Sequence, residues 1–256
     1  MNRARVIPVL LLQNTGLYKT VKFKDPKYVG DPLNAVKIFN EKQCDELILL
    51  DIFATKNKQP INYNIIREIA TECFMPLAYG GGISTLTDIE NVLKQGVEKV
   101  VINSSILRDP LFLTDAVKEF ASSTIVASVD VKKNIWGQYT VHSYSGEKIK
   151  YKDPADFLKF LEESEVGELM LNNIDRDGTM SGYDTELISK MSDITSLPLI
   201  AAGGCRDMND MYDLYTSTNV SATAAGSMFV FHGKHKAVLI SYPLPEEINL
   251  INKKWK

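Results

Sequence analysis

The chain has 256 residues, of which 45% are hydrophobic and 24% are charged, and its formal net charge is −3. This balance suits one large α/β domain and argues against a nucleic-acid-binding protein, while no stretch is long or apolar enough for a secretory signal or a membrane span. We therefore predict a cytoplasmic protein with no nucleic-acid partner and no membrane partner. Cys44, Cys73 and Cys205 are scattered, and the histidines stand at no metal-binding spacing, so no metal and no cofactor are predicted.

Short apolar runs alternate with amphipathic, helix-like segments along the whole chain. Eight such runs predict a parallel sheet, and without a dinucleotide-binding fingerprint or a second domain a (β/α)8 TIM barrel is the simplest closure. We predict one barrel domain over residues 1–256, with an inserted hairpin at about 134–151 and an atypical C-terminal segment at about 232–256. The predicted strands cover residues 6–12, 47–52, 76–81, 100–105, 124–131, 169–174, 198–204 and 222–227.

Two prolines stand where the eighth helix of such a barrel would run. They are Pro243 and Pro245. An internal proline ends or kinks a helix, because it lacks an N–H donor and its ring collides with the preceding turn. The sequence therefore predicts an eighth helix that is short or displaced.

The two halves of the chain repeat each other at an offset of 122 or 123 residues. A near-constant offset of half the chain predicts a barrel built from two half-barrels, with two equivalent sites for two similar chemical groups. Phosphate groups are the obvious candidates. The matching pairs are Glu46 and Glu168, Gly81 and Gly203, and Ser104 and Ser227.

Glycine-rich turns after the strands form two candidate phosphate-binding sets. Barrels bind phosphate on backbone N–H groups of such turns and on helix N-termini. For any one glycine a tight turn is the simpler explanation, but two symmetric sets, each ending in a hydroxyl residue at a helix start, favour anion binding. We therefore predict a phosphorylated small-molecule ligand. One set is Asp177, Gly178, Gly203, Gly204, Gly226 and Ser227, and the other is Gly81, Gly82, Asn103 and Ser104.

Several motifs, among them "YGGGI", "VINSS", "VDVKK" and "NIDRDGTMSGYDTELI", resemble the cyclase subunit of imidazole glycerol phosphate synthase. The resemblance runs from Arg5 to about Phe231. It implies a lyase of histidine biosynthesis that binds a substrate with a phosphate at each end. It also implies a glutaminase partner docked at the bottom of the barrel, from which ammonia is taken. The chemistry of that family uses two aspartates, at the ends of the first and fifth strands, as acid and base.

The resemblance fails at one of these two aspartates. Asp130 ends the fifth strand, but Leu11 occupies the place of the aspartate on the first. Gln13 and Asn14 do not titrate, and loss of one general acid or base costs about 10²–10⁴-fold in rate. We therefore expect efficient cyclase chemistry to be lost, although Asp130 alone could suffice. The segment before the turn glycine is also one residue longer, which affects the substrate loop that carries Lys19.

A side branch of the family resembles this chain more closely. "RVIPVLLL", "ECFMPLAYGGGI" and "AAGSMFVFHG" look like the cyclase-like proteins associated with acetamidino modification of sugars. That resemblance implies a barrel that pairs with a glutaminase and supplies ammonia to a sugar amidotransferase in the synthesis of a surface polysaccharide or related glycan.

Four charged residues stand immediately before predicted strands: Arg5, Glu46, Lys99 and Glu168. Each alone could be a solvated strand-start charge, whereas charges that point into the barrel mouth must pair, because burying an unpaired charge is costly. Together they match the salt-bridge ring that gates ammonia passage in the family, so we predict an ammonia gate.

Two functions stay open on this evidence. The first is a barrel that docks and activates a glutaminase and conducts ammonia, favoured by the four charges together with Leu11. The second is a working cyclase, favoured by the phosphate-binding sets, by Lys19 and Asp130, and by the "SYSG" segment at residues 143–146. A related sugar-phosphate isomerase would also need a carboxylate on the first strand.

Overall fold

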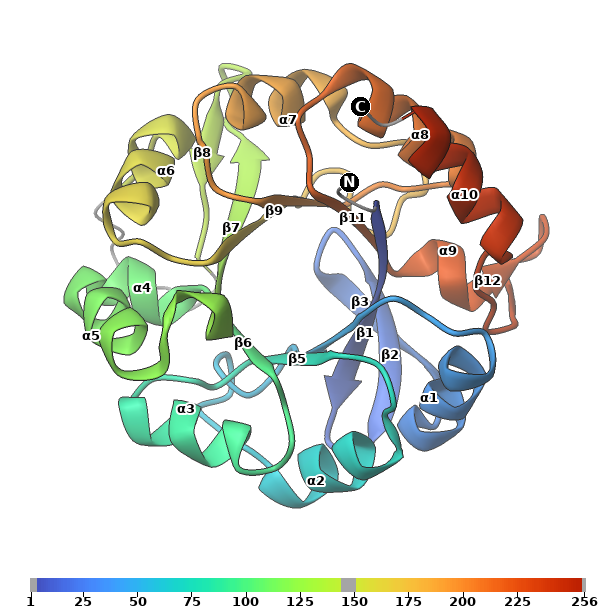
Figure 1. Cartoon of the computed structure of the whole chain (residues 1–256), viewed down its shortest axis with the longest axis horizontal. Coiled ribbons are helices and arrows are strands. Elements are labelled where there is room, and N and C mark those ends of the chain that lie inside the picture. The colour runs from blue at the N-terminus through green and yellow to red at the C-terminus, as the bar shows by residue number, and fades with distance from the viewer. Residues whose placement is uncertain (1–3, 144–150, 255–256) are drawn as a thin grey trace.

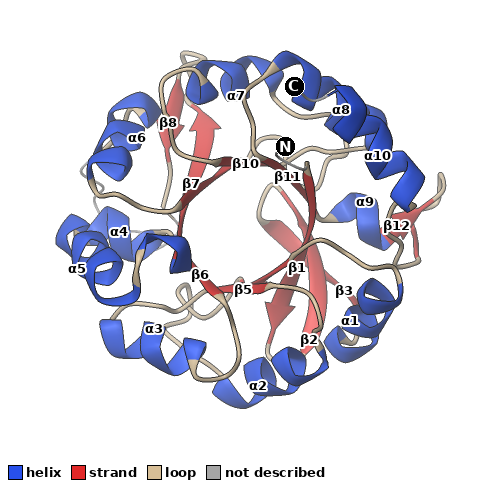
Figure 2. Ribbon diagram, in the orientation of Figure 1, coloured by secondary structure: helices blue, strands red, loops and turns tan. Residues whose placement is uncertain are grey.

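The computed structural model describes residues 4–143 and 151–254. Eight parallel strands form a closed barrel, in which β11 pairs with β1 to complete the ring (Figure 2). The predicted (β/α)8 barrel is thus confirmed. In the order in which they pair, the barrel strands are β1 (Arg5–Gln13), β4 (Leu47–Asp51), β5 (Leu77–Gly80), β6 (Lys99–Ile102), β7 (Ile125–Lys133), β9 (Glu168–Asn173), β10 (Leu199–Ala202) and β11 (Ala222–Ala225).

Helices surround the barrel on the outside (Figure 1). Most of them begin at a short polar residue whose side chain accepts a backbone N–H bond of the first turn, as Asp31 does from the N–H of Asn34. The helices are α1 (Pro32–Glu41), α2 (Tyr63–Glu72), α3 (Leu86–Leu93), α4 (Ser104–Arg108), α5 (Pro110–Phe120), α6 (Pro154–Glu163), α7 (Thr185–Ser192), α8 (Met208–Ser217), α9 (Ser227–Val230) and α10 (Pro245–Lys254), with a 3₁₀ turn η1 at Ser122–Thr124.

The apolar side chains form two separate clusters. The larger lies between the barrel and its helices, and includes Phe39, Phe157 and Phe229. The smaller fills the inside of the barrel, with Ile7 and Met170 among its members and Leu11 and Leu50 packed at its edge. This alternation of inward and outward side chains is that of a barrel with a packed interior.

The repeated segments of the two half-chains occupy opposite positions in the ring of strands. β4 lies four strands from β9, β5 lies four from β10, and β6 lies four from β11. The short helices that follow β6 and β11 begin at Ser104 and Ser227, the last of the repeated pairs. This placement fits the predicted half-barrel repeat.

Several strands lie outside the barrel. β2 (Gly16–Val21) and β3 (Lys24–Gly30) form an antiparallel hairpin that continues from β1. β8 (Tyr139–Val141) pairs antiparallel with β7, inside the segment predicted as a hairpin, of which residues 144–150 lie outside the described residues. β12 (Phe231–His232) and β13 (Ala237–Val238) form a short hairpin after α9.

The eighth helix was predicted to be short or displaced, and the structure shows that it is displaced but not short. α10 is ten residues long, because Pro245 is its first residue, where the missing N–H costs no helical hydrogen bond. The helix begins late, after an irregular segment in which the Tyr242 hydroxyl donates to the Val6 carbonyl at 2.8 Å. The Ala4 N–H donates to Asn252 at 2.7 Å, so α10 is tied to the start of β1.

Candidate functional site

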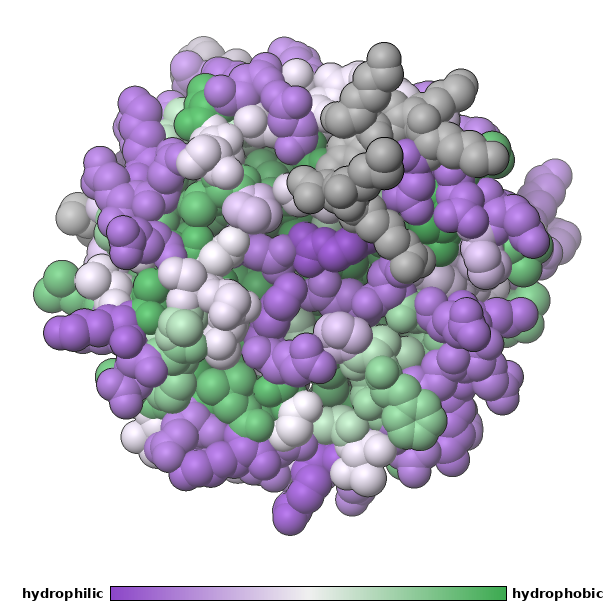
Figure 3. Space-filling view, in the orientation of Figure 1, coloured by the Kyte–Doolittle hydropathy of each residue, from purple (hydrophilic) through white to green (hydrophobic). Residues whose placement is uncertain are grey.

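The four charges predicted before the strands meet at the amino end of the barrel. Arg5 contacts Glu46 at 2.9 Å and Glu168 at 2.5 Å, and Lys99 contacts the same two carboxylates at 3.1 and 2.8 Å. The result is a closed ring of four ion pairs with no net charge, which we call the charged ring. In Figure 3, hydrophilic side chains gather over the barrel axis, with apolar side chains around them.

The charged ring is well shielded from water. The Glu46 side chain is 5% exposed and that of Glu168 is 13% exposed. Burial alone would raise the pKa of Glu168, but the neighbouring Arg5 and Lys99 hold it below its ordinary value. Glu168 is therefore charged at neutral pH, and both carboxylates contact the same two cations.

A pocket of about 460 Å³ lies at the opposite, carboxyl end of the barrel. All the residues predicted for catalysis, for phosphate binding and for the substrate loop line it. The structure thus brings together two sets of turns that are far apart in the sequence, as expected for the active-site face of such a barrel. These lining residues are Lys19, Gly81, Gly82, Asn103, Ser104, Asp130, Asp177, Gly178, Gly203, Gly204, Gly226 and Ser227, together with Leu11.

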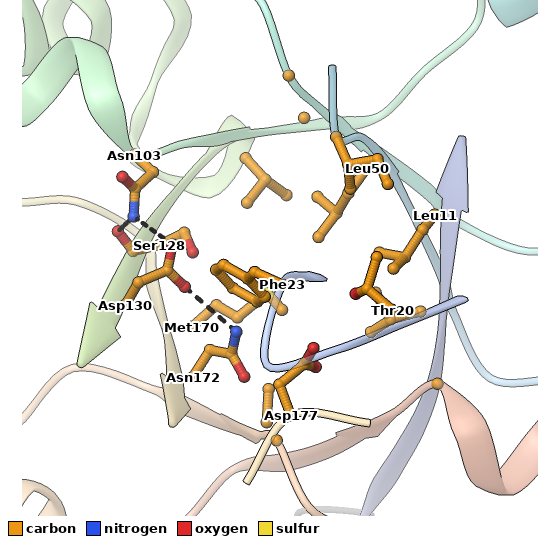
Figure 4. Close-up of a pocket in the computed structure, with 18 of the residues that line it drawn as sticks. Leu11, Thr20, Phe23, Leu50, Asn103, Ser128, Asp130, Met170, Asn172 and Asp177 are labelled. Atoms are coloured by element: carbon orange, nitrogen blue, oxygen red, sulfur yellow. Dashed lines mark hydrogen bonds between the residues drawn. The ribbon is translucent and has the colours of Figure 1, made fainter. Parts of the chain in front are cut away.

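Asp130 lies in the pocket wall with both carboxylate oxygens bonded. Asn103 Nδ2 donates to one oxygen and Asn172 Nδ2 to the other, each at 3.2 Å (Figure 4). Burial raises the pKa of Asp130 to about 7, against the opposing effect of the Asn172 hydrogen bond. A carboxyl group with that pKa can accept or release a proton near neutral pH.

Lys19 is buried on β2 beside one of the phosphate-binding sets. Its ammonium donates to the Val9 carbonyl at 2.6 Å and lies so close to Gly226 that a Cβ there would collide with it. Burial lowers the pKa of Lys19 and raises that of Asp177, while the attraction between the two opposes both shifts. The pair places one cation at the glycine turn where an anion is predicted to bind.

The wall opposite Asp130 is apolar. Leu11 and Leu50 lie together on that side, and the Phe23 ring lies between them and the polar wall (Figure 4). Leu11 therefore sits in the pocket, where the resemblance expects a carboxylate, and offers no group that can transfer a proton.

The β2–β3 hairpin is fastened to the rim of the pocket. The Lys22 N–H donates to the Asp177 carbonyl at 2.9 Å. Gly178 has a φ of +69° and lies against the Thr20 carbonyl, so a side chain would be both strained and obstructed. The hairpin holds Phe23 and Lys19 in the pocket.

Sequence reasoning missed several pocket residues. Asp51 ends β4 and accepts the N–H groups of Phe53 and Ala54, and burial raises its pKa. Asn172 has a second side-chain atom, Oδ1, that is buried without a hydrogen-bond partner. A polar residue directly after an apolar run was the available signal for both. Phe23 carried no such signal, because it lies in a hairpin that the sequence did not reveal.

Two further findings bear on the site. The "SYSG" segment falls largely on residues 144–150, outside the part that the structure describes. Over the described residues, no group of three His, Cys, Asp or Glu side chains is placed to hold a metal ion, and no helix is long and apolar enough to cross a membrane.

Comparison with known proteins gives a consistent result. The family model for histidine biosynthesis proteins matches residues 5–236. A Pseudomonas aeruginosa protein, provisionally named imidazole glycerol phosphate synthase subunit hisF2, is 52% identical over 95% of this chain and 97% of its own length. A Vibrio vulnificus protein, provisionally named subunit hisF3, is 47% identical over 96% and 95%. The imidazole glycerol phosphate synthase subunit HisF of Alkaliphilus metalliredigens is 34% identical over 89% and 90%.

Proposed function

The chain belongs to the histidine biosynthesis protein family as a HisF-like homologue of the cyclase subunit, and from this we propose that it pairs with a glutaminase and conducts ammonia without efficient cyclase chemistry. The relatives are named as subunits of imidazole glycerol phosphate synthase, and the resemblance to that family implies a glutaminase partner, so this class of partner is proposed here. The observation that carries the proposal is the contrast between the two ends of the barrel: the charged ring is complete, whereas Leu11 faces the pocket.

The charged ring is suited to the role of an ammonia gate. Four partly buried ionic groups are kept in a barrel mouth only at a desolvation cost, which an apolar layer would avoid. Above the ring the barrel interior is apolar, with Ile7, Ile48 and Met170 among its residues. Such an interior disfavours a charged ammonium ion and tolerates neutral ammonia, because burying an uncompensated charge costs far more than burying a small polar molecule.

In the pocket at the other end, no titratable side chain stands at position 11, across from Asp130. Asp130 can transfer a proton, but Leu11 and Leu50 on the far wall cannot. Ammonia that arrives in this pocket is then free to pass to another acceptor. By the resemblance to the glycan-associated branch, we propose that the acceptor is a sugar that an amidotransferase converts into an acetamidino derivative.

A second candidate function is the cyclase reaction itself. It is favoured by the pKa of Asp130 near 7 and by both glycine sets, which line one pocket as a substrate with two phosphates would require. The two candidates differ in whether an imidazole product forms, not in whether a glutaminase binds.

The partner proposal is tested by mixing the purified chain with a HisH-like glutaminase from the same organism and measuring glutamate release. We expect a stable complex and an increase in glutaminase turnover of at least tenfold. A Lys99→Met variant is expected to change the increase in glutaminase turnover. The control Lys94→Met removes only an exposed ion pair with Glu90 and is expected to leave that increase unchanged. Absence of a complex, or glutamate release that the chain leaves unchanged, would overturn the proposal.

A further inference from the structure

Two of the three most exposed large apolar side chains of the described residues lie next to each other in one turn. Ile135 is 91% exposed and Trp136 is 81% exposed. They occupy the turn at residues 134–138, between β7 and β8, which we call the Ile–Trp turn. Scattered single apolar residues are ordinary on a surface, but an adjacent isoleucine and tryptophan with almost no contacts do nothing for the fold.

The Ile–Trp turn is held in one conformation. Asn134 Oδ1 accepts the N–H groups of Trp136 at 2.9 Å and of Gln138 at 3.0 Å. The Asn134 N–H donates to the Gln138 carbonyl at 2.8 Å, and the Gly137 N–H donates to the Asn134 carbonyl at 3.0 Å. Because these bonds already fix the backbone, a partner that binds the two side chains loses little further conformational entropy.

Both flanks of the turn are anchored to the barrel. The Lys133 N–H donates to Asp175 at 2.9 Å, and the Lys133 ammonium lies 4.7 Å from the centre of the Tyr139 ring. The Tyr139 hydroxyl in turn donates to Asp184 at 2.6 Å. The Ile–Trp turn is thus a rigid projection rather than a loose loop.

The turn projects from the carboxyl end of the barrel, beside the pocket. β7 carries Asp130 in the pocket wall and continues directly into the turn. Ile135 is five residues beyond Asp130, so about 17 Å of extended chain separates the two. The charged ring lies at the opposite end, so a partner that binds the Ile–Trp turn does not compete with one docked on the ring.

The loops at this end are also rich in lysine. The lysines belong to segments that follow β1 and β4 or that end β7, so they emerge on the same face of the barrel. Among the described residues none of these lysines forms an ion pair. The lysines are Lys22, Lys24, Lys27, Lys56, Lys58, Lys132 and Lys133.

We propose that the Ile–Trp turn docks the enzyme that consumes the ammonia, an amidotransferase with an apolar socket for Ile135 and Trp136 and an acidic rim facing the lysines. This inference rests on the proposed function, because ammonia that enters at the charged ring must leave at the carboxyl end. Tryptophan is over-represented among the residues that dominate binding energy, and the unpaired lysines supply complementary charge. A consumer seated there would cover the pocket mouth and keep ammonia from the solvent.

Site-specific photo-crosslinking in the cells from which the gene comes tests the proposal. p-Benzoylphenylalanine is placed at position 136, at position 74, and at position 250 on α10 as a control. Phe74 is 85% exposed and precedes β5 at the amino end, while Leu250 is 60% exposed on the outer wall. Position 136 is expected to capture a sugar amidotransferase, position 74 the glutaminase, and position 250 neither.

The captured amidotransferase is then purified and titrated against the chain bound to its glutaminase. The double variant Ile135→Ala/Trp136→Ala is expected to weaken binding by about 30-fold or more, as loss of a dominant contact does. Leu250→Ala should bind as the unchanged chain does, and both variants should activate the glutaminase normally.

The outcomes separate the two proposals. The docking proposal is overturned if position 136 captures the glutaminase, a second copy of this chain or no protein, or if the double variant binds the amidotransferase normally. Failure of position 74 to capture a glutaminase would instead contradict the proposed function, whatever position 136 captures.

Discussion

Leu11 and Asp130 lie on opposite strands of the barrel, since β1 and β7 are four strands apart in either direction around the ring. Both strands are nine residues long, and each continues into an antiparallel hairpin. In a barrel made of two similar halves these are equivalent positions. One half therefore presents a carboxyl group with a pKa near 7, and the other presents a leucine.

Restoring the missing carboxylate is expected to restore chemistry. In Leu11→Asp a second titratable group would face Asp130, so cyclase activity should rise by about 10²-fold or more. Leu11 packs at the edge of the inner cluster, so burial of the carboxylate should lower the free energy of unfolding by about 1–3 kcal/mol. Activity is measured as imidazole product formed with ammonia supplied directly. Leu11→Asn, which cannot titrate, is the matched control, and equal activity of the two variants would contradict the interpretation.

The charged ring should be sensitive to loss of one cation. Lys99→Met leaves Glu46 and Glu168 with Arg5 alone, so the free energy of unfolding should fall by about 1–3 kcal/mol, less than for a fully buried pair because Lys99 is 21% exposed. Lys94→Met removes a surface ion pair with Glu90 and should change stability by less than about 0.5 kcal/mol. Urea denaturation of both variants checks this. Equal stabilities would mean that the ring charges are solvated rather than mutually compensated.

Asp130 should make stability depend on pH. Its folded pKa of about 7 lies above its ordinary value of 3.8, so the folded state holds a proton that the unfolded state releases. The free energy of unfolding therefore falls as the pH rises from about 4 to about 7. In Asp130→Asn, which cannot titrate, this fall should disappear. The free energy of unfolding of the variant, relative to that of the unchanged chain, should grow over this pH range and level off above it, reaching a difference of about 1–4 kcal/mol at pH 8. A difference that does not vary with pH would contradict the raised pKa.

The β2–β3 hairpin should depend on Gly178. A side chain there would have an unfavourable φ and would press on the Thr20 carbonyl, so Gly178→Ala should cost about 2–4 kcal/mol and release the hairpin from the pocket rim. Gly233 has a similar φ of +70° with open space around it, so Gly233→Ala should cost about 1–2 kcal/mol, from strain alone. Thermal unfolding compares the two variants, and similar losses would show that the hairpin contact adds nothing.

Features with a periodic or symmetric sequence signal were predictable. The barrel followed from alternating apolar and amphipathic segments. Arg5, Glu46, Lys99 and Glu168 were recognised as strand-start charges, and the family resemblance predicted that they form a ring, while glycines and polar residues at strand ends marked the pocket. The barrel is confirmed, and the predicted residues lie at the expected ends because strand direction in a parallel barrel fixes which residues share an end.

Features that depend on tertiary contacts were not predictable. The β2–β3 hairpin has an exposed, charged second strand, with no apolar alternation to mark it, and it is held by Gly178 and the Asp177 carbonyl far along the chain. The place of Phe23 in the pocket follows from that hairpin. Pro245 was taken as a helix breaker because its position within the helix, at the first residue, could not be known from the proline alone.

The most direct test of the central claim is the ratio of imidazole product to glutamate in the reconstituted complex. The chain, its glutaminase, glutamine and the phosphorylated cyclase substrate are mixed, and both products are followed over the same interval. We predict steady glutamate release with less than about 1% as much imidazole product, the deficit expected from loss of one acid–base group. A ratio near one would contradict the account, since it would mean that Asp130 performs the cyclase chemistry without a carboxylate at position 11.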